Sequence, residues 1–127
     1  MSQNTLFAEE VMERLRERNP RYQETAYFFV LSALHHVLEE IGRARHISGR
    51  ELAEGVRDLA LRRYGPMART VLEFWGIEST ADVGAIVFAL VDAGVLIKQD
   101  DDSPEDFEAI FDFDEAFERN YPWGANI

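Results

Sequence analysis

The sequence has no cysteine, a single lysine and no long apolar run among its 127 residues. Without thiols, the chain can build neither a disulfide framework nor a thiolate metal site, and it has no cysteine nucleophile. A membrane-spanning helix needs about 18 consecutive apolar residues, whereas the first twenty positions of this chain already contain seven charged ones. We therefore expect neither a signal peptide nor a membrane span, and we predict a cytoplasmic protein.

Enough apolar residues are present to form a core without covalent cross-links. Hydrophobic residues make up 46% of the chain and aromatic residues 12%, which excludes a disordered protein. A chain of this length buries about two-thirds of the surface that its unfolded form exposes. Since no internal repeat or low-complexity linker interrupts the sequence, we predict a single domain over residues 1–127.

The acidic residues are concentrated in one half of the chain. The net charge is −11, yet residues 1–72 hold ten acids and eleven bases, a balance of +1. Residues 73–127 hold fourteen acids and two bases, a balance of −12. This half would repel phosphates, so the charge argues against nucleic acid as a partner and favours a basic protein. Adaptation of the surface to a salty cytoplasm is the alternative, although the neutral first half argues against it.

Apolar residues at helical spacing predict five helices before residue 95. Ser48 and Glu51 form a capping-box pattern at the start of the third helix, and Ser79 or Thr80 is placed to cap the fifth. A Gly-Pro pair follows the third helix, and a glycine follows the fourth and the fifth. The second predicted helix, residues 22–43, is apolar on nearly every side, which is typical of a helix in the middle of a bundle. The predicted helices cover residues 5–18, 22–43, 49–64, 66–75 and 80–93.

After residue 94 the apolar spacing changes from helical to alternating. Residues 95–99 are predicted to form a strand, and residues 107–113 a second strand with one buried face. Asp114 is placed to cap a short final helix, which an extended tail follows. The domain therefore divides into four parts: an N-terminal helix (1–20), a helical core (21–94), a β-hairpin (95–113), and a short helix with a tail (114–127).

This order of elements predicts a mainly α fold, a helical bundle with a C-terminal winged-helix-like part. In the DNA-binding version of that fold, the helix before the hairpin enters the major groove and carries basic or amide side chains. Residues 80–93 contain no Lys, Arg, Asn or Gln. The loop between the predicted strands, residues 100–106, would direct five carboxylates at the phosphates. We therefore expect no DNA binding.

Four short stretches resemble an uncharacterised family of short bacterial proteins. They are His46-Ile47-Ser48-Gly49-Arg50-Glu51-Leu52, Trp75-Gly76-Ile77, Val87-Phe88-Ala89-Leu90-Val91 and Glu105-Asp106-Phe107. The resemblance extends over roughly residues 22–123 and implies a bacterial origin. The family carries no catalytic motif, so the resemblance implies no functional residue.

The histidines are the first candidate metal ligands. His35 and His36 each stand one helical turn before a glutamate, Glu39 and Glu40 respectively. Carboxylate-bridged bundles need Glu-x-x-His on two helices, and here the order is reversed and occurs once. Adjacent side chains on a helix also point about 100° apart. We interpret these residues as a polar helix face with ion pairs.

No other motif predicts catalysis or a cofactor. The aspartate-rich loop from Asp100 has Glu105 and Phe111 where a calcium-binding EF-hand loop needs Gly and Glu, so we expect no dedicated metal site. No serine lies in a Gly-x-Ser-x-Gly turn, and no glycine-rich phosphate loop occurs. We predict no catalytic, cofactor-binding or metal-ligating residue.

The sequence favours a protein-interaction or regulatory module that binds an unknown, basic protein. The predicted partner-binding residues are Asp100, Asp101, Asp102, Glu105, Asp106 and Glu108. One alternative is a small enzyme or ligand carrier with a site between bundle and hairpin. A second is a winged helix associated with nucleic acid, which the charge argues against. A local basic patch at Arg43, Arg45 and Arg50 also leaves homo-oligomers open.

Overall fold

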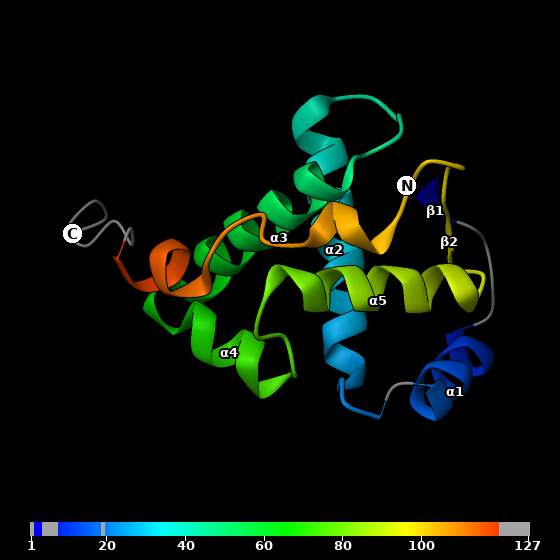
Figure 1. Cartoon of the computed structure of the whole chain (residues 1–127), viewed down its shortest axis with the longest axis horizontal. Helices are drawn as coiled ribbons and strands as arrows, with labels where there is room; N and C mark the ends of the chain where they lie inside the picture. The colour runs from blue at the N-terminus through cyan, green and yellow to red at the C-terminus, as the bar shows by residue number, and fades with distance from the viewer. Residues whose placement is uncertain (1, 4–7, 19, 120–127) are drawn as a thin grey trace.

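The computed structural model describes residues 2–3, 8–18 and 20–119, and this part of the chain is mainly helical (Figure 1). Its α-helices are α1 (Ala8–Arg18), α2 (Glu24–Ile41), α3 (Gly49–Tyr64), α4 (Ala68–Phe74) and α5 (Thr80–Asp92). The shorter elements are the 3-10 helices η1 (Gly65–Met67) and η2 (Pro104–Phe107), the π-helical turn η3 (Glu115–Arg119), and the strands β1 (Ser2–Gln3) and β2 (Leu96–Ile97). The predicted mainly α class is confirmed.

The predicted cap at the start of α3 is present. The Ser48 hydroxyl accepts a hydrogen bond from the Glu51 amide at 3.1 Å, and the Glu51 carboxylate accepts one from the Ser48 amide at 3.1 Å. This exchange satisfies two amides at the helix start, of which the Glu51 amide lies in the first turn and lacks an intrahelical partner. The predicted bounds of this helix are therefore confirmed.

Asp82 organises the start of α5. Its buried carboxylate accepts hydrogen bonds from the amides of Glu78 at 2.8 Å and Ser79 at 3.2 Å. It also accepts one from the Tyr22 hydroxyl at 2.6 Å, and burial together with this bond raises the pKa of Tyr22. Asp82 thus caps α5 and ties it to the segment before α2.

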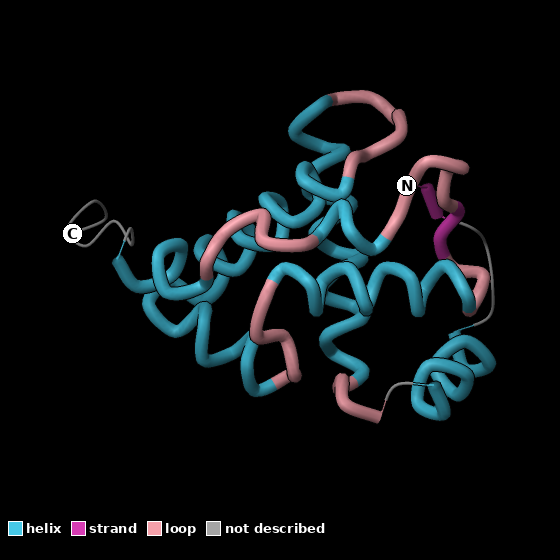
Figure 2. Tube along the Cα trace, viewed as in Figure 1, coloured by secondary structure: helices cyan, strands magenta, loops and turns pink. Residues whose placement is uncertain are grey.

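The core lies where α2, α3 and α5 pack together (Figures 1 and 2). Figure 1 shows α5 crossing in front of α2, and α4 near the C-terminal end of α3. Large, fully buried side chains come from all three core helices: Tyr27 and Leu34 from α2, Leu52 from α3, and Ile86 and Leu90 from α5. The central place predicted for residues 22–43 is confirmed.

The first predicted strand is present but has a different partner. β2 pairs antiparallel with β1, which places Ser2 opposite Ile97 and Gln3 opposite Leu96. The ladder therefore joins segments that are far apart in the sequence. The predicted β-hairpin over residues 95–113 is wrong.

The second predicted strand, residues 107–113, forms no strand. The chain instead makes η2, which ends at Phe107, and Ala109 has a φ of +49°, a left-handed conformation that interrupts an extended run. The alternating phenylalanines have another explanation, because Phe107 and Phe113 are separately buried in the helical core. Without a hairpin, residues 95–113 form no wing, and the winged-helix-like part of the prediction is also wrong.

Phe107 is held between α3 and α5. It is fully buried, and a Cβ atom added at Gly84 of α5 would lie 2.7 Å from the Cβ of Phe107. A Cβ atom added at Gly49 of α3 would lie 3.2 Å from its ring. The ring of Phe88 meets that of Phe107 edge-on, with centroids 6.4 Å apart. Two glycines therefore make the space that this phenylalanine fills.

Asp112, rather than the predicted Asp114, caps the final helical turn. Its carboxylate accepts hydrogen bonds from the amides of Asp114 at 2.8 Å and Glu115 at 3.2 Å. Phe117 then packs edge-on against Phe113, with ring centroids 5.0 Å apart. The predicted tail, residues 120–127, lies outside the described residues.

The sequence predicts no membrane span. Within the described ranges, no helix combines the length and the apolar character that a bilayer crossing requires.

Candidate functional site

Ten acids and no base lie between Asp100 and Glu118. We call residues 100–118 the acidic segment. Figure 1 shows it running from the end of the molecule that holds β2, past α5 and α3, to η3 near α4. Phe107, Phe113 and Phe117 in this segment are each 5% exposed or less. The segment is therefore fixed at three points, although little of it has regular secondary structure.

Five of the six predicted partner-binding residues are exposed. They are Asp100, Asp101, Glu105, Asp106 and Glu108. The side chains of Asp100, Asp101 and Glu108 form no ion pair or hydrogen bond with the described part of the chain. Their charges are thus available to a partner.

Asp102, the sixth, faces the protein. Its side chain is 8% exposed, and its Oδ1 lies 3.3 Å from Nε2 of His46 in the loop between α2 and α3. Its Oδ2 accepts a hydrogen bond from the Gln99 amide at 2.8 Å. Asp102 therefore fastens the acidic segment to the helical core, in contrast to the partner contact predicted for it.

Two exposed acids also have local partners. The Asp106 carboxylate accepts a hydrogen bond from the Ser103 amide at 3.0 Å, at the start of η2. Hydrogen bonds from its own backbone amide and from the Ser103 side chain lower the pKa of Glu105. Glu105 is therefore ionised at neutral pH.

Arginines partly neutralise the C-terminal end of the acidic segment. Arg69 of α4 lies 3.3 Å from Asp114 and 3.8 Å from Glu118. Arg119 lies 2.7 Å from Asp114. The uncompensated negative charge is therefore concentrated in residues 100–108.

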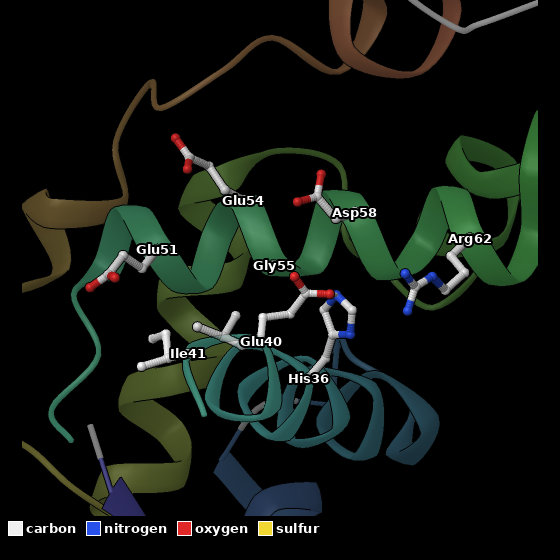
Figure 3. Close-up of a pocket in the computed structure, with 9 residues that line it drawn as sticks. His36, Glu40, Ile41, Glu51, Glu54, Gly55, Asp58 and Arg62 are labelled. Carbon is white, nitrogen blue, oxygen red and sulfur yellow. Dashed lines mark ion pairs between the residues drawn. The ribbon is translucent and has the colours of Figure 1, made fainter. Parts of the chain in front are cut away.

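A second polar surface lies between α2 and α3 (Figure 3). Two hollows of about 390 Å³ each lie between these helices, and both are lined by His36 and Arg62. Figure 3 shows the first of them. We call the two together the α2–α3 groove. The polar residues that line only the first hollow are Glu40, Glu51, Glu54 and Asp58, and those that line only the second are Ser32, His35, Glu39 and Arg63.

Three of the four acids of the first hollow pair with arginines, and the fourth, Glu40, lies near His36. The pairs are Glu40 with His36 at 3.7 Å, Glu51 with Arg45 at 2.6 Å, Glu54 with Arg50 at 3.5 Å, and Asp58 with Arg57 at 3.0 Å. The hydrogen bond from Arg45, together with that from the Ser48 amide, lowers the pKa of Glu51 to about 2. This hollow is therefore largely neutralised from within.

Arg62 and Arg63 have no acidic partner in the part of the chain that the structure describes. Arg62 also forms no hydrogen bond there, and the Arg63 guanidinium lies 5.9 Å from the centroid of the Phe29 ring. Both lie in the last turn of α3, where free carbonyl groups stabilise cations. In Figure 3, Arg62 extends from α3 toward the gap into which His36 of α2 projects.

The histidines do not assemble a metal centre in this part of the chain. The predicted contact of His36 with Glu40 is present, with Nε2 and Oε1 3.7 Å apart. Within residues 2–3, 8–18 and 20–119, no three His, Asp or Glu side chains are grouped so that they could hold a metal ion.

A smaller hollow lies close to where the alternative ligand site was predicted. It has a volume of about 250 Å³ and lies between α3 and residues 111–116. Its charged lining residues, Arg57 and Glu115, are not buried. A ligand carrier needs buried polar groups that fix its ligand, so this hollow gives the alternative no support.

One local signal in the sequence was overlooked. Ser103-Pro104-Glu105-Asp106 combines a capping serine, a proline in the first turn and an acid three residues after the cap, which is typical of a helix start. It predicts η2 in place of a loop. The sequence could not predict that Arg62 lines the α2–α3 groove. This position depends on how α2 and α3 cross, and no pattern within either helix indicates the crossing.

No family model, curated protein or solved structure matches the chain. The resemblance to an uncharacterised bacterial family stays a prediction.

Proposed function

We propose that this protein is an interaction module that acts in the cytoplasm and binds a basic region of a partner protein through the exposed acids of the acidic segment. The observation that carries this proposal is the combination of charge and anchoring. Ten acids without a base lie on a segment that three buried phenylalanines hold against the helical core.

Anchoring favours binding because a fixed segment loses little conformational freedom when a partner docks. A flexible acidic tail would have to be ordered at that moment. The charge itself would act mainly on the association rate, since complementary fields steer the encounter. A partner with clustered Lys and Arg fits both properties.

A protein partner fits the charge better than a nucleic acid does. α5 has no Lys, Arg, Asn or Gln, and its only charged residues are Asp82 and Asp92. Phosphate binding depends on cations that displace counterions. The acidic segment would oppose such binding.

The proposal can be tested with a ten-residue lysine peptide and two variants of equal net charge. The first is Asp100→Asn, Asp101→Asn and Glu108→Gln in the acidic segment. The second is Glu10→Gln, Glu13→Gln and Glu17→Gln on α1, where all three residues are exposed. Each removes three negative charges, so the overall charge of both falls from −11 to −8.

We expect the first variant to associate with the peptide several-fold more slowly than wild type at about 0.05 M salt, and the second to stay close to wild type. The difference should disappear at about 0.5 M salt, where screening is strong. Equal slowing in both variants would mean that only total charge matters, and that the acidic segment is a solubilising surface.

A further inference from the structure

The second hollow of the α2–α3 groove is basic in an acidic protein. Arg62 and Arg63 line it from α3, and Ser32, His35 and His36 line it from α2. Glu39 is the single acid in its lining. With both histidines neutral, two arginines against one glutamate leave a local charge of +1, while the chain as a whole carries −11.

The missing acidic partner of Arg62 does not reflect a shortage of acids. The chain has 24 acids and 13 bases. Seven other arginines form ion pairs with acids, namely Arg16, Arg21, Arg45, Arg50, Arg57, Arg69 and Arg119. Glu39 lines the same hollow, yet it forms no ion pair with Arg62 or Arg63. Within the described residues, no acid therefore neutralises the charges of Arg62 and Arg63.

We infer that this hollow binds a phosphate-type oxyanion, either free phosphate or a small phosphomonoester. The lining supplies donors from two helices: the guanidinium groups of Arg62 and Arg63 from α3, and the hydroxyl of Ser32 from α2. Guanidinium groups bind phosphate oxygens through paired, charge-assisted hydrogen bonds. Several donors around one hollow suit an anion with three or four acceptor oxygens better than a carboxylate with two.

His36 and Arg62 are placed to act together. Both line both hollows, and Figure 3 shows them approaching the same gap from opposite helices. Nε2 of His36 lies 3.7 Å from Oε1 of Glu40. The His36 side chain is 14% exposed, so the imidazole is held in place rather than free in solvent.

A neighbouring acid limits the size of the ligand. Glu40, which pairs with no arginine of the described residues, lines the adjoining hollow. A nucleic acid would bring further phosphates close to this carboxylate, which would repel them. A single phosphate group avoids this repulsion. The site therefore fits a small ligand and lies apart from the acidic segment of the proposed function.

The test is a titration of the full chain with inorganic phosphate, followed by amide NMR shifts, at constant ionic strength. We expect saturable shifts that concentrate in residues 32–39 of α2 and 59–63 of α3. The double variant Arg62→Gln and Arg63→Gln should weaken binding by about tenfold or more, because it removes two charge-assisted contacts. A parallel titration with glycerol 1-phosphate separates the two sources: tighter binding of the ester identifies a phosphomonoester, and equal or weaker binding identifies free phosphate.

The matched control is Arg14→Gln with Arg43→Gln. Both arginines are exposed, neither forms an ion pair with the described residues, and the variant loses the same charge. It should bind phosphate within about twofold of wild type, since surface charges at a distance are screened. Shifts that do not saturate, or equal weakening in both variants, would show adventitious ion binding only and overturn the inference.

Discussion

The helical core and the acidic segment fix their backbones in different ways. Between α2 and α5, most amides bond within helices, and regular apolar spacing builds the buried faces. In the acidic segment, the carboxylates of Asp102, Asp106 and Asp112 accept backbone amides, and isolated phenylalanines supply the burial. Three of the ten acids thus have structural roles. The number of acids alone therefore overstates how many carboxylates of the acidic segment are available to a partner. The small amount of helix in this segment likewise understates how firmly its backbone is held.

The largest effect should come from breaking the main anchor of the acidic segment. Phe107→Ala removes a fully buried ring from between α3 and α5, and such deletions cost about 3–5 kcal/mol of unfolding free energy. Denaturant titration measures this loss. Hydrogen exchange should show protection falling first in residues 98–113, while far-UV circular dichroism keeps its helical signal.

Phe74→Ala is the matched control. It removes the same ring from a site that is 72% exposed, so the free energy of unfolding should change by about 0.5 kcal/mol or less. Comparable losses in the two variants would mean that Phe107 is no anchor, and the contrast between core and segment would fail.

Asp82→Ala tests the polar link inside the helical core. The change leaves the Tyr22 hydroxyl and the amides of Glu78 and Ser79 without their acceptor. Unsatisfied buried groups cost about 1–3 kcal/mol, measurable by chemical denaturation. Tyr22→Phe removes only the hydroxyl, so a larger loss in this variant than in Asp82→Ala would contradict the capping role.

Ser48→Ala tests the cap where core and segment meet. The cap starts α3, and the next residue, Gly49, has its Cβ position 3.0 Å from the Cβ of Asp106. Loss of a capping hydroxyl costs about 1 kcal/mol. Thermal denaturation should show the loss in Ser48→Ala and a smaller one in Ser48→Thr, which keeps the hydroxyl. An unchanged midpoint in Ser48→Ala would refute the role of this cap.

The other half of the same cap predicts a dependence on pH. The pKa of Glu51 is lowered from 4.5 to about 2 in the folded protein, so its ionised form stabilises the fold. This contribution is fully present above pH 4.5 and is lost as pH falls through about 2. The difference in unfolding free energy between wild type and Glu51→Gln should therefore be constant near neutral pH and shrink below pH 4.5. A difference that grows on acidification would contradict it.

The smallest effect should come from neutralising exposed acids. The triple variant Asp100→Asn, Asp101→Asn and Glu108→Gln removes like charges that repel one another, so it should stabilise the fold by up to about 0.5 kcal/mol at low salt. Denaturation at about 0.05 M and 0.5 M salt should show this gain shrinking as screening increases. A loss of stability would show that these acids have structural roles, as Asp102 does.

The helical core was largely predictable because its rules are local. Helical spacing, the Ser48 cap and the glycines after helices depend on neighbours within a turn or two, and the bounds of α3 follow from them. The pairing of β2 was not predictable, because its partner, β1, lies more than ninety residues earlier. A two-residue strand also carries too little alternation to identify a partner.

The acidic segment was misread because one pattern has two physical causes. Alternating phenylalanines indicate a strand when a neighbouring strand is available. Here Phe107 fills a gap between two helices and Phe113 packs on Phe117, so the spacing reflects separate burial sites. The exposed acids of the candidate site could be predicted from the composition of residues 100–108. The burial of the Asp102 side chain could not be predicted, because it depends on a contact with His46 in the loop between α2 and α3.

The fit of Phe107 against Gly84 bears on how sequences of this fold can vary. With a Cβ position 2.7 Å from Phe107, residue 84 accepts a side chain only if residue 107 becomes smaller or moves away. Residue 49 has the same ring 3.2 Å from its own Cβ position. Substitutions at residues 49, 84 and 107 should therefore be correlated among homologous proteins, and a protein that loses glycine at residue 84 should have lost the aromatic ring at residue 107 as well.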